Sequence, residues 1–135
     1  MSIHPHRLKR VRAFLQIAAR ELRSAKLLAG ESPEDALFLL QQSSEKLARA
    51  LIEAAGLVAG TTHNIQTLAE ILPEGHALKD SLKPVYDLST AATRFRYPTS
   101  GGNIFEADMD VAAAAAHVEQ LMNSVIDYLK NQKLT

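Results

Sequence analysis

Residues 33–55 read PEDALFLLQQSSEKLARALIEAA. Apolar or small side chains recur in them every three or four residues, as on one side of an α-helix: Leu37, Leu40, Ser44, Leu47 and Leu51. Ser32, Pro33 and Asp35 provide an N-cap hydroxyl, a first-turn proline and an acid three residues after the cap, which together indicate a helix start. We therefore predict a helix that begins near Pro33 and closes near Gly56, a residue suited to a helix end.

A longer amphipathic helix is predicted before this one, from Arg7 to Ala29. Its apolar stripe has the same spacing and consists of Leu8, Val11, Leu15, Ala18, Leu22 and Ala25. Gly30 suits the left-handed conformation that ends many helices. Because only a short connection joins the two predicted helices, we expect them to pack as an antiparallel hairpin.

The chain after Gly56 is also predicted to be helical. A short helix covers about residues 65–72 and is ended by Pro73. A further helix covers about residues 78–95, with a kink or restart at Pro84, which lacks a backbone donor. These two segments fill the middle of the chain.

The last predicted helix follows a loop over Tyr97–Asn103 and is capped by Asp108. Its apolar face consists of Val111, Ala114, Val118, Leu121, Val125, Tyr128 and Leu129. No strand-like alternation of useful length and no long repeat is present. The predicted fold is all-α, an up-and-down bundle of four to five helices that forms a single domain over residues 1–135.

Composition excludes several classes of protein. The chain has 135 residues, of which 47% are hydrophobic and 22% charged, as in a globular protein, so disorder is not expected. It contains no cysteine, which excludes disulfides, thiolate metal sites and a cysteine nucleophile and favours a reducing, cytoplasmic location. The uninterrupted apolar runs are far shorter than the roughly 20 residues that cross a bilayer, so we expect no membrane span.

Positive charge is concentrated in the first predicted helix. Residues 7–26 hold seven of the 15 basic residues and one acid, Glu21. A basic face of this kind attracts phosphates or an acidic partner. A charge-rich stripe is also the usual solvated side of an amphipathic helix. The sequence leaves both interpretations open, and with them contact between this helix and RNA.

Six consecutive polar residues interrupt the second predicted helix. They are Gln41, Gln42, Ser43, Ser44, Glu45 and Lys46. Six positions surround the helix, so at least one side chain has to face the bundle or a partner and needs hydrogen-bond partners there. Gln41 with Glu45, Gln42 with Lys46, and Glu45 with Arg49 are four residues apart and act on one face. The block is either an interhelical polar network or a surface that contacts a ligand or partner.

Two further places carry candidate binding residues. His63 follows a glycine–threonine loop, where its ring contacts a neighbouring helix or a bound anion, but no set of metal ligands at suitable spacing accompanies it. Arg94, Arg96 and Tyr97 stand at the end of the fourth predicted helix. Basic residues at this position interact favourably with the helix dipole. Alternatively, the arginines clamp a phosphate while the tyrosine stacks on a nucleobase or sugar. We predict no catalytic residue, no metal site and no cofactor.

Taken in order, these features resemble the HEPN family, the higher eukaryotes and prokaryotes nucleotide-binding domain. The resemblance rests on QQSSEKLARAL at residues 41–51, on Gly56, on His63 with Leu68, and on Arg96-Tyr97-Pro98. It covers nearly the whole chain. It implies a bundle of four or five helices, frequent homodimerisation and, in many members, action beside a separately encoded minimal nucleotidyltransferase.

The family that this chain resembles also includes ribonuclease toxins. Those members carry an arginine that is followed, after four to six intervening residues, by a histidine. This sequence departs from that pattern, because no arginine stands five to seven positions before His63, His76 or His117. The leading expectation is therefore a homodimeric, non-enzymatic partner subunit that binds a nucleotide or substrate, in a two-component or toxin–antitoxin-like system. The alternatives are a ribonuclease toxin with a degenerate motif and a structural dimerisation module.

Overall fold

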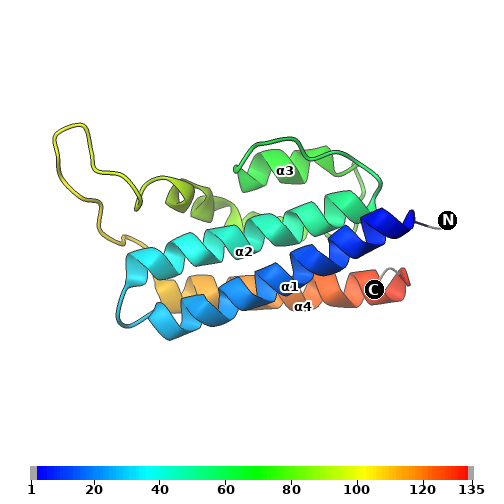
Figure 1. The fold of residues 1–135 in the computed structure, drawn as a ribbon, viewed down its shortest axis with the longest axis horizontal. Coiled ribbons are helices and arrows are strands. Elements are labelled where there is room, and N and C mark those ends of the chain that lie inside the picture. Colours follow the sequence, from blue (N-terminus) through cyan, green and yellow to red (C-terminus); the bar gives the residue numbers. More distant parts are fainter. Residues whose placement is uncertain (1–2, 134–135) are drawn as a thin grey trace.

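The structure is a computed structural model that describes residues 3–133, and in this range all the regular secondary structure is helical, without a strand. The elements are α1 (Pro5–Leu28), α2 (Pro33–Ala54), α3 (Ile65–Ile71), the 3-10 helix η1 (Asp80–Ala92) and α4 (Val111–Asn131). The predicted all-α bundle is thereby confirmed (Figure 1). No helix in the described range is both long and apolar enough to cross a bilayer.

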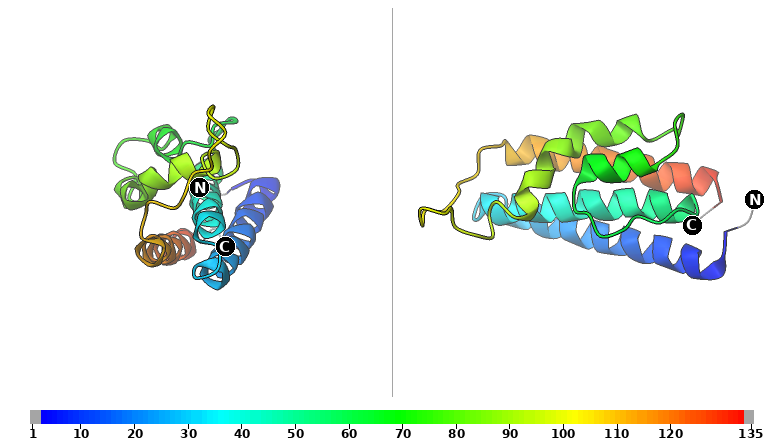
Figure 2. Two further views of the ribbon diagram at one scale, coloured as in Figure 1. Left: turned by 90° about the vertical axis from the view of Figure 1, so that its left-hand side faces the viewer. Right: turned by 90° about the horizontal axis from the view of Figure 1, so that it is seen from above.

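Helix α2 is the centre of the bundle. It contacts α1, α3, η1 and α4, whereas α1 contacts only α2 and α4 (Figures 1 and 2). The leucines of the predicted α2 stripe, Leu37, Leu40, Leu47 and Leu51, are all completely buried. One side of α1 therefore faces away from the rest of the bundle, while α2 has neighbours in all four other elements.

The turn between α1 and α2 differs in detail from its prediction. Gly30 is not among the glycines in the left-handed region, because the turn uses right-handed geometry in which the Ser32 N–H donates to the Leu28 carbonyl at 2.7 Å. The Ser32 hydroxyl donates to the Asp35 carboxylate at 2.6 Å and makes no bond to the helix backbone. The antiparallel hairpin itself forms as predicted.

Helix α2 ends where the sequence indicates. Gly56 has φ of +76°, a left-handed conformation that side-chain-bearing residues rarely adopt. This conformation turns the chain so that the Leu57 N–H donates to the Ile52 carbonyl at 3.0 Å. The segment after Gly56 then passes back over α2 toward α3 (Figure 1).

The fourth helical segment is a 3-10 helix, although the sequence analysis predicts a kinked helix over residues 78–95. Its buried side chains are spaced by three residues: Leu82, Val85, Leu88 and Ala91. A 3-10 helix has three residues per turn, so this spacing places all four on one side of η1, which packs against α2, α3 and α4. Pro84 lies inside the helix and is exposed, where its missing donor costs little.

The connection from η1 to α4 is longer than predicted. The loop was expected over residues 97–103, but irregular chain extends from the end of η1 to Asp110. Asp110, not Asp108, is the N-cap of α4, and its Oδ1 accepts a hydrogen bond from the Ala113 N–H at 3.1 Å. Asp108 instead pairs with Arg94, whose Nη1 lies 2.8 Å from the carboxylate.

Candidate functional site

The polar block at the middle of α2 is mostly buried. Four of its side chains are inside the bundle: Gln41, Ser43 and Ser44 at 0% exposure and Glu45 at 4%. Ser43 donates to the Ala18 carbonyl of α1 at 2.8 Å, and Ser44 donates to the Leu40 carbonyl one turn earlier. No buried side-chain nitrogen or oxygen within the described residues lacks a hydrogen-bond partner. The block is therefore a satisfied network between helices.

Three side chains of this network contact the carboxylate of Glu45. Its Oε1 accepts from Gln41 Nε2 at 3.1 Å, and its Oε2 accepts from Arg49 Nε at 3.0 Å. His63 Nδ1 lies 3.1 Å from Oε1 and 3.2 Å from Oε2. Three side chains from two parts of the chain thus surround one buried carboxylate.

The surroundings of Glu45 favour its ionised form. Burial alone raises the pKa of a carboxyl group, because it penalises the charge. Here the hydrogen bonds from Gln41, Arg49 and His63, with the charge interaction of His63, outweigh that burial and lower the pKa of Glu45. A carboxylate held in this way keeps its neighbours in place at neutral pH.

The same side chains fix the segment before α3 against α2. Arg49 donates through Nη1 to the Gly60 carbonyl at 3.0 Å and through Nη2 to the Thr62 carbonyl at 2.6 Å. Gln41 Nε2 also donates to the His63 carbonyl at 3.1 Å. Arg49 and Gln41 therefore position the backbone that carries His63, and their hydrogen-bond donors are bonded to acceptors within the protein.

His63 is the accessible member of this group. Its side chain is 67% exposed, although Glu45 beneath it is almost fully buried. The imidazole uses Nδ1 toward Glu45, and no hydrogen bond to Nε2 occurs within residues 3–133. A carboxylate that holds one ring nitrogen fixes the orientation of the ring. The structure thus presents an oriented imidazole to solvent.

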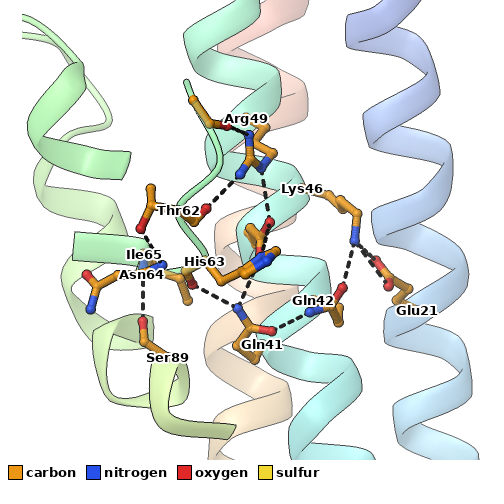
Figure 3. Close-up of polar contacts among 12 residues, drawn as sticks. Glu21, Gln41, Gln42, Lys46, Arg49, Thr62, His63, Asn64, Ile65 and Ser89 are labelled. Carbon is orange, nitrogen blue, oxygen red and sulfur yellow. Dashed lines mark hydrogen bonds and ion pairs between the residues drawn. The ribbon is translucent and has the colours of Figure 1, made fainter. Parts of the chain in front are cut away.

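A second arm of the network leads from Gln41 to α1 (Figure 3). Gln42 Nε2 donates to Gln41 Oε1 at 2.7 Å, and Gln42 Oε1 accepts from Lys46 Nζ at 3.2 Å. Lys46 Nζ also lies 3.3 Å from both carboxylate oxygens of Glu21. These long contacts do not offset burial of the carboxylate, and the pKa of Glu21 is raised.

The residues after η1 divide into two groups. Arg94 is occupied, because it pairs with Asp108 and lies 5.3 Å from the Phe105 ring centroid. Arg96 is exposed and stacks above Phe38 of α2, with its guanidinium carbon 5.0 Å from the ring centroid. Tyr97 is 62% exposed. Of the predicted basic and aromatic residues here, Arg96 and Tyr97 remain accessible.

Arg96 and His63 lie along one face of α2. Phe38, beneath Arg96, and Glu45, beneath His63, are seven residues apart, which is close to two complete helical turns and about 10 Å along the axis. The exposed guanidinium of Arg96 and the exposed imidazole of His63 therefore lie in a row over α2, and Tyr97, which is also exposed, follows Arg96 in the chain. We call His63, Arg96 and Tyr97 the α2 binding face.

Two residues that support the candidate site were not predicted from the sequence. Glu21 closes the network from α1, and Phe38 supports Arg96. Glu21 does carry a signal, since it is the lone acid among the bases of residues 7–26. Phe38 looks like an ordinary apolar residue, and only the fold brings Arg96 onto it. No group of three potential metal-binding side chains occurs within the described range 3–133.

Comparison with known proteins places this arrangement in a family. The family model of the HEPN domain matches residues 11–131. The crystal structure of an archaeal HEPN homologue resembles this fold with a TM-score of 0.65 at 22% sequence identity, over 88% of this chain and 97% of that one. No curated protein matches the chain in sequence. With nearly its whole length matched by the family model, the chain belongs to the HEPN domain family.

Proposed function

We propose that this HEPN protein is a non-catalytic subunit that binds a nucleotide or nucleotide-like substrate beside a separately encoded minimal nucleotidyltransferase. The observation that carries the proposal is the exposed, oriented His63 imidazole in a row with Arg96 on one face of α2. Both groups bind anions when charged. The pair fits the phosphate chain of a nucleotide better than it fits an uncharged ligand.

Each residue of the α2 binding face has a distinct role in this proposal. Arg96 contacts phosphate oxygens through its guanidinium, and protonated His63 donates Nε2–H to a neighbouring phosphate. The exposed ring of Tyr97 offers a stacking surface to the base or sugar. Glu45, Gln41 and Arg49 lie behind this face and act by holding His63 in position.

The remaining members of the predicted site have supporting places. Gln42 and Lys46 are partly buried on the side of α2 that turns toward α1, where their polar atoms already contact Gln41 and Glu21. Arg94 is held by Asp108 and Phe105. A nucleotidyltransferase partner would then approach over the α2 binding face, since the bound nucleotide has to reach its active site.

A ribonuclease is the second candidate, and one observation favours it. The contact between Glu45 and His63 Nδ1 leaves Nε2 free to accept a proton, as a general base requires. Cleavage of RNA without a metal also needs a proton donor for the leaving oxygen. His63 is the only histidine or carboxylic acid of the α2 binding face, so no second acid–base group of this face supplies that proton. We therefore rank binding above catalysis.

We also propose a homodimer. Several large apolar side chains of the described chain are exposed: Leu27, Val58, Ile104 and, less fully, Phe105. Ile104 and Phe105 are adjacent on the long loop before α4 and would be covered by a second copy. Size-exclusion chromatography with light scattering should give twice the monomer mass of 14.7 kDa. A mass of one chain at micromolar concentration would contradict it.

Calorimetric titration tests the nucleotide proposal. ATP and GTP are titrated into the wild type, the His63→Ala and Arg96→Ala variants, and Lys130→Ala as a control on the exposed last turn of α4. We expect saturable binding by wild type and control, and at least tenfold weaker binding by each variant of the face. The titrations are repeated with any minimal nucleotidyltransferase that a neighbouring gene is found to encode.

The outcomes separate the candidates. Binding that is unchanged in both variants would place the nucleotide elsewhere on the protein. Absence of binding in every titration, with a stable dimer by light scattering, would instead favour a structural dimerisation module.

A further inference from the structure

The outward side of α1 carries an uncompensated row of positive charge. Among the helices, α1 packs on α2 and α4 alone, and its exposed residues cover about half of its circumference. Four basic residues on that side are exposed: Lys9, Arg12, Arg20 and Arg23. At 3.6 residues per turn, they fall within roughly 80° of arc and extend over about 21 Å. We call these four residues the α1 basic stripe.

The other three bases of α1 already have partners inside the protein. Arg7 donates to the Glu53 and Leu57 carbonyls at the end of α2. Arg10 pairs with the Glu53 carboxylate at 3.0 Å, and Lys26 pairs with Glu119 at 2.7 Å. Their charge is thus used to hold α1 against α2 and α4.

The single acidic residue of α1 does not neutralise the positive charge of the α1 basic stripe. Glu21 turns inward, with 14% of its side chain exposed, and faces Lys46 of α2. No ion pair of Lys9, Arg12, Arg20 or Arg23 occurs within residues 3–133. Solvated helix faces usually mix both signs of charge, because like charges three or four residues apart repel. A stripe of one sign indicates a polyanionic partner.

We propose that the α1 basic stripe binds the phosphate backbone of double-stranded DNA, independently of sequence. The stripe consists of two pairs, Lys9 with Arg12 and Arg20 with Arg23. The inner members, Arg12 and Arg20, are eight residues and therefore about 12 Å apart along the helix. The major groove of B-form DNA is also about 12 Å wide, so each pair reaches one of its two flanking backbones.

The side chains between the two pairs fit the same geometry. Ala13 and Gln16 are exposed there, and neither carries a charge or a bulky ring. A small residue and an amide let a helix approach base edges without a clash. The α1 helix thus lies over the groove with its centre toward the bases and its two ends on phosphates.

Other polyanions fit this surface less well. Single-stranded RNA is bound on aromatic side chains, and none belongs to the stripe. Duplex RNA has a deep, narrow major groove that does not admit a helix. An acidic protein would require an apolar centre to its interface, but the only large apolar side chain of this face is Leu27 at its end. An anionic membrane surface offers no groove to match the paired spacing.

The proposal sets the salt dependence of binding. Four neutralised phosphates give a slope of log affinity against log salt of about −3.6 for B-form DNA. Between 50 and 200 mM salt, binding should then weaken by about 150-fold. Fewer contacts would give a proportionally shallower slope.

Fluorescence anisotropy with a labelled DNA duplex of about 20 base pairs tests the proposal. The test variant combines Lys9→Gln, Arg12→Gln, Arg20→Gln and Arg23→Gln. The control removes the same charge elsewhere, through Lys26→Gln, Lys83→Gln, Lys130→Gln and Lys133→Gln, all exposed residues outside the stripe. Circular dichroism verifies that both remain helical, since glutamine is a good helix former.

We expect the wild type and the control to bind within threefold of each other at 50 mM salt, with the predicted slope. The test variant should bind at least 100-fold more weakly. An equal loss of DNA affinity in the test and control variants would show that only the net charge of the protein matters, and it would overturn the proposal. Binding to duplex RNA or to vesicles of anionic phospholipid that equals or exceeds binding to DNA would also overturn it, as would a wild type that binds no DNA at 50 mM salt.

Discussion

At the scale of single residues, Glu45 organises the candidate site. Its buried carboxylate accepts hydrogen bonds from Gln41 and Arg49 and contacts His63. Replacement by alanine leaves Arg49, only 15% exposed, without its carboxylate. We expect Glu45→Ala to lower the free energy of unfolding by roughly 3 kcal/mol, as for a broken buried ion pair. Urea denaturation of wild type and variant measures this change.

Glu119→Ala is the matched control for that prediction. Glu119 also pairs with a cation, Lys26, but both side chains are close to half exposed. An exposed pair contributes at most about 1 kcal/mol. Equal effects of the two substitutions would show that the Glu45 network does not stabilise the fold.

The contributions of Glu45 and Glu21 to the stability of the fold should change in opposite directions as the pH falls. The pKa of Glu45 is lowered from 4.5, so its stabilisation is complete above pH 4.5 and is lost as the pH falls through the lower value. The pKa of Glu21 is raised, so its contribution is complete below pH 4.5 and is lost as the pH rises through the higher value. Relative to wild type, Glu45→Gln should lose least stability at acid pH, and Glu21→Gln should gain stability toward neutral pH. Thermal unfolding between pH 3 and 7 should reveal these opposite trends, and parallel ones would refute them.

Residue types alone identify part of this network. Six polar residues around one helix require partners, which is a local argument and predicts burial of some of them. The identity of the partners depends on which helices meet, so Glu21 and the Gly60 and Thr62 carbonyls could not be named in advance. The sequence also could not distinguish Arg96, which is exposed, from Arg94, which is occupied.

At the scale of elements, η1 shows how periodicity carries more information than composition. Leu82, Val85, Leu88 and Ala91 recur strictly every three residues, without the steps of four that an α-helix requires. That signal is present in the sequence and indicates a 3-10 helix. Because 3-10 helices as long as Asp80–Ala92 are rare, this spacing alone does not predict one. Packing against the neighbouring helices stabilises the 3-10 form in this protein.

The start of α4 gives a prediction at this scale. Asp110 accepts the Ala113 N–H, so removing its oxygen leaves a helix donor without its cap. Asp110→Ala should cost about 1 kcal/mol of stability, while Asp110→Asn should be nearly neutral because asparagine caps equally well. Urea denaturation of the two variants measures the difference. If the alanine and asparagine variants were equally stable, the cap would have no energetic role.

At the scale of the whole molecule, the helical bundle follows from the sequence because long amphipathic stripes leave few alternatives. The apolar stripes of α1 and α2 and the short connection between them predict the antiparallel hairpin, and the ordered motifs at residues 41–51, 63–68 and 96–98 identify the family. The placement of His63 and Arg96 along one face depends on the path of residues 55–64 and 93–110. These segments have no period, and their positions result from tertiary contacts such as those of Arg49.

The proposed non-catalytic role predicts that purified protein does not cleave RNA in the absence of metal ions. Cleavage requires both a proton acceptor and a proton donor, and His63 is the only histidine or carboxylic acid of the α2 binding face. Incubation of a labelled single-stranded RNA with wild type and with Arg96→Ala measures this. Cleavage by the wild type that the substitution abolishes would establish the ribonuclease alternative.

Histidine NMR during titration with ATP and GTP tests whether a nucleotide contacts His63. The chain has five histidines, of which His117 is exposed on α4 and provides an internal control. We predict that the ring signals of His63, assigned with the His63→Gln variant, shift saturably with one of these nucleotides while those of His117 remain in place. Saturable nucleotide binding without a shift of the His63 signals, or shifts of all five histidines in proportion to added nucleotide, would contradict nucleotide contact at His63.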